Sequence, residues 1–183
     1  MSYAILDNNR YYAEGLRFSL LRRHPQAGVE SQDIRWHSAL LARNTLAIRC
    51  RFSITAAHHS LITILLRLEA ARWEGSLYLV CNEKGWALAT HLRKRFEMLT
   101  IYIIDDRIAV ADAPYVLDKE PRRTRSLDSC LTGTEFNVLD LLISGIPVRH
   151  IAILTNMPEK QVSSHKCNAL KKLNANNLLQ LLL

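Results

Sequence analysis

The stretch Leu131–Leu173, LTGTEFNVLDLLISGIPVRHIAILTNMPEKQVSSHKCNALKKL, decides the fold of the last third of the chain. Thr132 and Glu135 have the spacing of a capping box, in which each side chain satisfies a free backbone donor at the start of a helix. Apolar residues at helical spacing follow, and Ser144-Gly145 ends this first helix. A compact helical unit is therefore expected to begin at Thr132.

Two further helices follow in the same stretch. Pro147 suits the first turn of a helix, because its missing N–H would be unpaired there in any residue. The apolar set of this second helix is Ile151, Ala152 and Leu154. Asn156-Met157-Pro158 then predicts a tight turn, and a third helix is predicted from about Glu159 to Leu173.

A helical wheel gives the third helix two different faces. The inner face carries Val162, His165, Ala169 and Leu173. The outer face carries Lys160, Ser164, Cys167, Asn168 and Lys171, with Ser163 at its margin. Small side chains allow close approach to DNA, Ser and Asn bond base edges, and lysines reach phosphates. The pattern thus predicts a helix that enters the DNA major groove.

This stretch resembles the LuxR-type (FixJ/NarL-type) helix-turn-helix. The matching positions are Leu131, Thr132, Glu135, Val138, Leu139, Gly145, Ile151, Ala152, Lys160, Val162, His165, Asn168, Lys172 and Leu173. The resemblance implies that the third helix is the recognition helix, with its lysines on phosphates and Ser163, Ser164 and Cys167 on bases. The residues expected at double-stranded DNA are Lys160, Gln161, Ser163, Ser164, Lys166, Cys167, Asn168, Lys171 and Lys172.

The chain departs from this family pattern in three places. Pro158 stands where the family usually has a Ser or Thr helix cap. Ser163 and Cys167 stand where members often carry basic or larger polar groups, which predicts weak affinity for DNA or help from a partner. The fourth helix, which the family uses to dimerise, is reduced to the short, apolar Asn176–Leu183. Its leucines are either core or a surface that another chain covers.

Strand and helix patterns alternate before this domain. The strand candidates are Tyr3–Leu6, Asp33–Ala39, Thr45–Phe52, Ser76–Cys81 and Leu99–Ile104, and the helix candidates are Tyr12–Arg23, Ala56–Trp73 and Glu83–Phe96. This alternation predicts an α/β fold with a parallel sheet and helices on both faces. Residues 119–129 have the composition of a linker. The predicted domains are therefore an α/β domain over 1–118 and an all-α four-helix domain over 130–183.

The start of the α/β domain, Ile5-Leu6-Asp7-Asn8, is similar to the first strand of receiver domains. A working receiver needs two acids after strand one, a phosphorylated Asp after strand three and a Lys after strand five. Here Asn8 replaces the second acid, Arg49-Cys50-Arg51 offers no Asp, and Asp105-Asp106 is followed by no Lys. The resemblance therefore implies a degenerate receiver-like domain with no phosphorylation site.

Composition sets the other bounds. The formal net charge is +7, and residues 122–183 hold eight Lys and Arg against four acids, which favours a polyanionic partner. The four cysteines have no zinc-binding spacing, and no signal peptide or membrane span is expected.

His58-His59 and Asp105-Asp106 are weak metal candidates, because a helix separates adjacent side chains and a strand end is often simply solvated. Cys167 fits a small groove-facing residue better than a redox sensor. Arg122, Arg123 and Arg125 fit a solvated linker or a phosphate contact.

These features predict a bacterial, phosphorylation-independent transcription regulator that binds DNA as a homodimer or as a heterodimer with a LuxR-type response regulator. Such a protein is cytoplasmic and associated with the nucleoid. The alternative is an adaptor or anti-activator that heterodimerises with another regulator and does not bind DNA itself. No nucleophile–base pair or glycine-rich phosphate loop indicates an enzyme, and no catalytic residue, cofactor or metal is expected.

Overall fold

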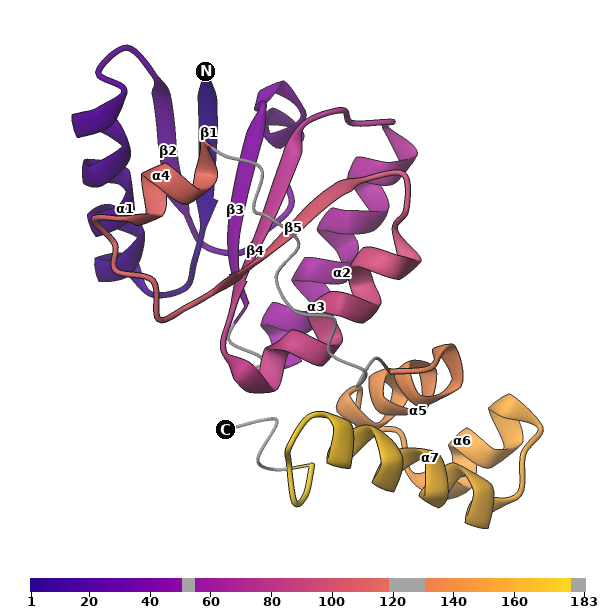
Figure 1. Cartoon of the computed structure of the whole chain (residues 1–183). Helices are drawn as coiled ribbons and strands as arrows, with labels where there is room; N and C mark the ends of the chain where they lie inside the picture. Colours follow the sequence, from indigo (N-terminus) through magenta and orange to yellow (C-terminus); the bar gives the residue numbers. More distant parts are fainter. Residues whose placement is uncertain (51–54, 119–130, 179–183) are drawn as a thin grey trace.

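The computed structural model describes residues 1–50, 55–118 and 131–178. Its first part is a sheet of five parallel strands in the order β2-β1-β3-β4-β5 (Figure 1). The strands are β1 Ser2–Leu6, β2 Gly28–Gln32, β3 Thr45–Cys50, β4 Ser76–Cys81 and β5 Thr100–Asp105. This is a doubly wound order, in which the carboxyl ends of β1 and β3 meet where the strand order reverses.

Helices cover both faces of the sheet, as predicted (Figure 1). The helices are α1 Arg10–Arg23, α2 Thr55–Ala70, α3 Glu83–Arg95 and the short α4 Ala113–Leu117. Because side chains alternate along a strand, β1 feeds two cores. Tyr3 and Ile5 pack with α1 and α4, whereas Ala4 and Leu6 pack with α2 and α3.

One local prediction in this domain is wrong. The strand expected over Asp33–Ala39 does not form: β2 is Gly28–Gln32, and a 3-10 turn, η1, covers Ser38–Ala42. Strand β2 lies at the sheet edge, pairs with β1 alone and has no fully buried side chain, so it leaves little apolar pattern. Helix α4, the last of the domain, has only five residues.

The C-terminal domain contains α5 Gly133–Ile143, α6 Val148–Thr155 and α7 Glu159–Lys172. The predicted capping box is present: the Glu135 backbone N–H donates to Thr132 Oγ1 over 3.2 Å, and the Thr132 N–H donates to Glu135 Oε2 over 2.7 Å. Residues 176–178 are not helical, and the rest of the predicted fourth helix lies outside the described residues. The linker, with its three arginines, also lies outside them.

Helix α5 lies against the α/β domain (Figure 1). The rings of His91 on α3 and Phe136 on α5 stack with centroids 4.4 Å apart, and His91 Nδ1–H donates to the Leu131 carbonyl over 3.1 Å. His59 Nε2 lies 3.0 Å from Ser144 Oγ at the end of α5. His59 therefore contributes to the contact between the two domains. Among the described residues, His, Cys, Asp and Glu side chains form no group that could hold a metal ion.

Candidate nucleic-acid interface

Helix α7 packs on α5 and α6 through one face, which lies in the helical unit at the lower right of Figure 1. The buried side chains are Val162, Ala169, Leu170 and Leu173. The predicted inner face is confirmed for three of these residues, and Leu170 joins them. His165 is only half-buried. Packing on this face fixes the rotation of α7 and determines which side chains it presents to solvent.

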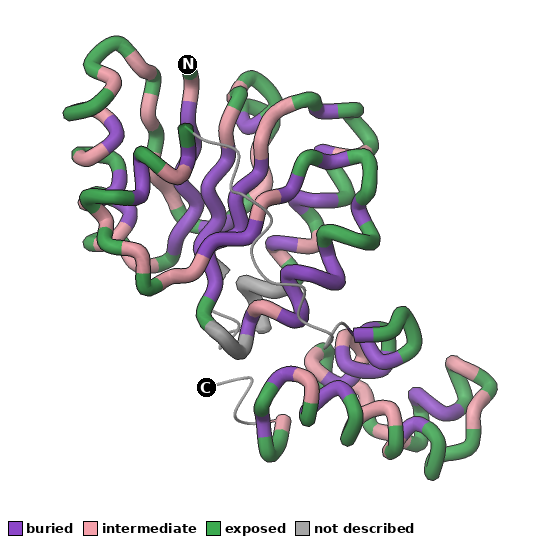
Figure 2. Tube along the Cα trace, in the orientation of Figure 1, coloured by how far each residue is buried: buried purple, intermediate pink, exposed green. Residues whose placement is uncertain are grey.

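The opposite face of α7 is exposed along its whole length, as the alternation of buried and exposed positions in Figure 2 shows. The exposed residues, called the α7 outer face below, are Lys160, Gln161, Ser164, Cys167, Asn168 and Lys171. Ser163 is half-buried at its margin, whereas Lys166 is half-buried on the inner side, one helical turn from Val162 and Leu170. Ser164 Oγ donates to the Lys160 carbonyl over 3.1 Å, which leaves its oxygen free to accept a hydrogen bond from a ligand.

Lys172 differs from the other residues predicted to contact DNA, because its side chain forms an ion pair inside the domain. Its Nζ donates to Glu135 Oε2 over 2.7 Å, and its side chain is half-buried. Burial raises the pKa of Glu135, but hydrogen bonds from Lys172 and the Thr132 backbone and the charge of Lys172 outweigh this, so the pKa is lowered. Lys172 thus ties α7 to the capping box of α5, a role that the sequence did not indicate.

The turn before α7 follows the expected departure from the family. Asn156 ends α6 with φ 53°, a left-handed conformation that Asn tolerates better than most residues. Pro158 precedes α7 and supplies no side-chain cap. Of the apolar residues predicted for α6, Ile151 and Ala152 are buried, whereas Leu154 is exposed together with Ile153, because 3.6-residue periodicity turns that pair away from the core.

The carboxyl ends of β1 and β3 hold an internal ion pair. Asp7 and Arg49 are only 5% and 8% exposed, and Arg49 Nη1 lies 3.5 Å from Asp7 Oδ2. The Asn9 backbone N–H donates to Asp7 Oδ1 over 2.8 Å. The Arg49 guanidinium also lies over the Tyr12 ring, 3.8 Å from its centroid. A cation of the protein itself therefore faces the acid retained at the end of β1.

Two other polar side chains at this edge, those of Asn8 and Asp105, are hydrogen-bonded within the protein. Asn8 Oδ1 accepts from the Ile34 N–H over 3.2 Å, and Asp105 accepts from the Arg107 guanidinium over 2.9 Å. No acid occurs from residue 50 to residue 54. Mg²⁺ prefers carboxylates with open coordination positions. The residues at the site of a receiver's Mg²⁺ therefore do not fit that ion.

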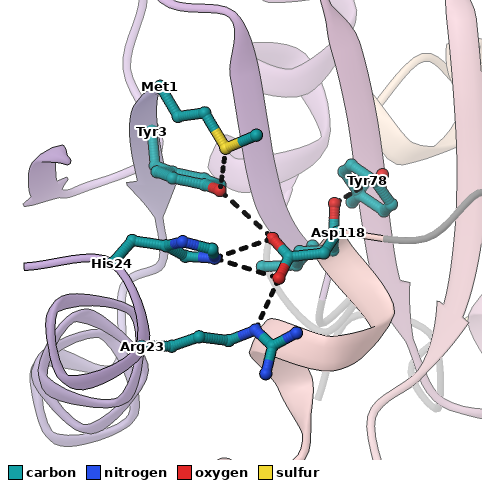
Figure 3. Close-up of polar contacts among 7 residues, drawn as sticks. Met1, Tyr3, Arg23, His24, Tyr78 and Asp118 are labelled. Carbon is teal, nitrogen blue, oxygen red and sulfur yellow. Dashed lines mark hydrogen bonds and ion pairs between the residues drawn. The ribbon is translucent and has the colours of Figure 1, made fainter.

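A polar cluster around Asp118 fixes the end of the α/β domain (Figure 3). The Asp118 carboxylate accepts from Arg23 Nε over 2.6 Å and from Tyr3 Oη over 3.3 Å, and it pairs with His24 Nε2 at 2.9 Å. Tyr78 Oη donates to the Leu117 carbonyl over 2.9 Å. Burial, with the charge of Asp118, raises the pKa of Tyr3 to about 12. The cluster holds α4 against α1, and sequence reasoning missed it because its members lie far apart in the chain.

Comparison with known proteins agrees with this geometry. Residues 129–183 match the family described as bacterial regulatory proteins, luxR family. One similar solved structure contains two RcsB dimers bound to two parallel DNAs, with 22% identity, a TM-score of 0.56, and coverage of 100% of this chain and 96% of that chain. Another is RcsB from Salmonella enterica serovar Typhimurium bound to promoter P1flhDC, with 23% identity, a TM-score of 0.55, and coverage of 100% and 96%. No curated protein matches the chain.

These likenesses confirm the predicted fold: a receiver-like α/β domain followed by a LuxR-type helix-turn-helix domain. Among the described residues, the helices are all too short or too polar to cross a membrane.

Proposed function

We propose that this chain, whose residues 129–183 match the luxR family, is a sequence-specific DNA-binding transcription regulator that acts at the bacterial nucleoid. The α7 outer face carries this proposal. Lys160 and Lys171 stand at its two ends, where they suit phosphates, and Ser164 and Asn168 lie between them with groups that recognise base edges. A helix presented in this way after a first helix and a tight turn suits the major groove.

Binding to duplexes that the protein itself enriches from a random-sequence pool tests this proposal. We expect Lys171→Ala to weaken binding to every duplex about tenfold, because a lost phosphate contact carries no sequence information. Ser164→Ala should reduce the preference for the enriched sequence over a random one, because it removes a base-facing group. Lys94→Ala, at an exposed lysine on α3, is the matched control and should bind like the wild type. Wild-type binding by both α7 variants would show that this face does not contact DNA.

The regulator is further proposed to work without phosphorylation. The pairing of Asp7 with Arg49, the bonds to Asn8 and Asp105, and the lack of an acid after β3 support this step. The conformation that binds DNA would then need no phosphoryl group at the carboxyl edge of the sheet.

Beryllofluoride, a phosphoryl mimic, provides the check. With MgCl₂ and beryllofluoride present, the melting temperature and DNA affinity should equal those in MgCl₂ alone, because Asp7 and Asp105 are already paired with Arg49 and Arg107. Acetyl phosphate should likewise leave the protein unlabelled. Stoichiometric phosphate on Asp7 or Asp105 would contradict phosphorylation independence.

One observation favours a second function, that of an adaptor or anti-activator. Ile153 and Leu154 are adjacent, exposed and apolar on α6, beside a recognition helix whose Ser163 and Cys167 are small. Such a surface suits a protein partner, for example a LuxR-type response regulator, better than a phosphate backbone. The random-pool selection separates the two functions: an adaptor enriches no sequence on its own but forms a stable heterodimer.

A further inference from the structure

A buried histidine lies at the contact between the two domains. His91 of α3 is 9% exposed, and its ring stacks on that of Phe136 of α5 with centroids 4.4 Å apart. Phe136 is itself buried and belongs to one apolar cluster with residues of α2, α3 and the sheet. Docking of α5 therefore supplies the ring that covers the imidazole of His91.

The hydrogen bond of His91 determines which of its nitrogens can take up a proton. A carbonyl oxygen only accepts, so Nδ1, which lies 3.1 Å from the Leu131 carbonyl oxygen, carries the hydrogen of the neutral ring. Nε2 is then the atom that gains a proton in acid. Within the described parts of the chain the ring is hydrogen-bonded through Nδ1 alone, so the docked contact offers the new N–H no acceptor.

The charges nearest to His91 along α3 also disfavour a second cation. Arg95 and Lys94 are both exposed on this helix, and the Arg95 guanidinium lies 5.4 Å from the centroid of the Phe136 ring. Burial lowers the pKa of His91, and the charges of Arg95 and Lys94 add to this effect. The hydrogen bond to Leu131 opposes it without cancelling it. The docked contact therefore favours the neutral imidazole.

Helices α5, α7 and α2 supply the other titratable groups at this contact. Glu135 of α5 is paired with Lys172 of α7 at 2.7 Å. His59 of α2 lies 3.0 Å from Ser144 Oγ, at the other end of α5. Because Ser144 Oγ donates its own hydrogen to a backbone carbonyl, His59 is the donor in this pair and can donate in both of its protonation states. Of these two histidines, His91 is the one whose protonation opposes docking.

We propose that His91 makes the docking of the helix-turn-helix domain depend on pH, so that acid releases α5 from α3. The neutral ring fits between Phe136 and Leu131, whereas the charged ring is better solvated by water than between two domains. Contacts between domains of one chain are usually modest in size, so one ionisation within the contact shifts the balance between the docked and released forms. This adds a regulatory input to the proposed function, and it does not depend on DNA binding because docking uses α5 and α3 rather than the α7 outer face.

Proton linkage gives the direction and the pH range of this effect. In the released form His91 lies in water with an ordinary pKa of about 6.5, and in the docked form its pKa is lower. Docking is therefore strongest above about pH 6.5 and weakens as the pH falls below that value, until the pKa of the docked form is reached. From about pH 7.5 to about pH 5.5 we expect the docking equilibrium constant to fall up to about tenfold.

The rotational tumbling of the two domains in the full chain, without DNA, tests this proposal, so its failure would leave the α7 proposal standing. In ¹⁵N relaxation, the wild type should give one rotational correlation time for both domains at about pH 7.5. At about pH 5.5 the domains should give separate, shorter times, while circular dichroism shows that both stay folded. His91→Asn keeps an amide donor for Leu131 but cannot ionise, so it should tumble as one body at both pH values. His150→Asn, at an exposed histidine on α6, is the matched control and should respond to acid like the wild type.

The ionisation of His91 in the wild type provides a second readout, which holds even if His91→Asn does not fold or dock. Release and protonation are one linked step, so the NMR signals of the His91 ring and the tumbling of the domains should change with the same pH midpoint. Different midpoints would show that another group controls release. A wild type that tumbles as one body at both pH values, or a His91→Asn variant that acid releases as readily as the wild type, would likewise overturn the proposal.

Discussion

Arg49→Met is expected to lower the free energy of unfolding of the α/β domain by about 3–5 kcal/mol, because it leaves an uncompensated buried charge. Methionine keeps much of the arginine stem and removes the guanidinium. Asp7, at 5% exposure, then keeps the Asn9 N–H but loses the cation that faces it. The contact of the guanidinium with the Tyr12 ring is lost as well.

Urea denaturation followed by circular dichroism measures this loss, and a double variant identifies its cause. Asp7→Asn/Arg49→Met buries no charge and should recover a large part of the stability lost in Arg49→Met alone. Arg107→Met, which breaks the exposed pair with Asp105, is the control and should change stability far less. An Arg49→Met effect as small as that of Arg107→Met would show that the Asp7–Arg49 pair does not stabilise the domain.

Phe136→Ala is expected to destabilise the helix-turn-helix domain by about 3–5 kcal/mol and to loosen its contact with α3. Phe136 is 2% exposed and lies between the two domains, where it stacks on His91 and meets the Arg95 guanidinium 5.4 Å from its ring centroid. The substitution therefore opens a cavity in one domain and removes the ring that covers a histidine of the other.

Calorimetry and the titration of His91 by NMR report these two effects separately. Burial lowers the pKa of His91, aided by the charges of Arg95 and Lys94 and opposed by the hydrogen bond to Leu131. In Phe136→Ala the His91 imidazole becomes more exposed to solvent, so the pKa of His91 should rise toward its ordinary value. Val138→Ala, on the same helix but in a core away from α3, should destabilise α5 without moving that pKa. No change in the His91 pKa in Phe136→Ala would contradict the docked arrangement.

The sequence predicted the elements whose signals are local. Thr132 and Glu135 are three residues apart, and each satisfies a backbone group of the other, so their spacing alone predicts the start of α5. The outer face of α7 follows in the same way from periodicity within a single helix. Strand β2 has no such signal, because it exists through pairing with β1 and buries no side chain fully.

Contacts between residues that lie far apart in the chain could not be predicted from the sequence. Inspection of the receiver-like positions showed that acids were missing, but not that Arg49 lies against the one that remains. The Asp118 cluster joins residues 95 positions apart, and Lys172 reaches Glu135 across 37 positions. Such pairs depend on how the helices pack, which no spacing rule specifies. Family resemblance therefore predicted Lys172 as a phosphate ligand, whereas helix packing places it in an ion pair with Glu135.

The central claim is that the α7 outer face binds DNA, and the salt dependence of binding tests it most directly. Fluorescence anisotropy gives the affinity of the wild type, Lys171→Ala and Lys94→Ala for one duplex over a range of NaCl concentrations. If Lys171 neutralises a phosphate, Lys171→Ala should lower the slope of log affinity against log salt by about 0.9, and Lys94→Ala should keep the wild-type slope. Equal slopes and affinities for wild type and Lys171→Ala would contradict the claim.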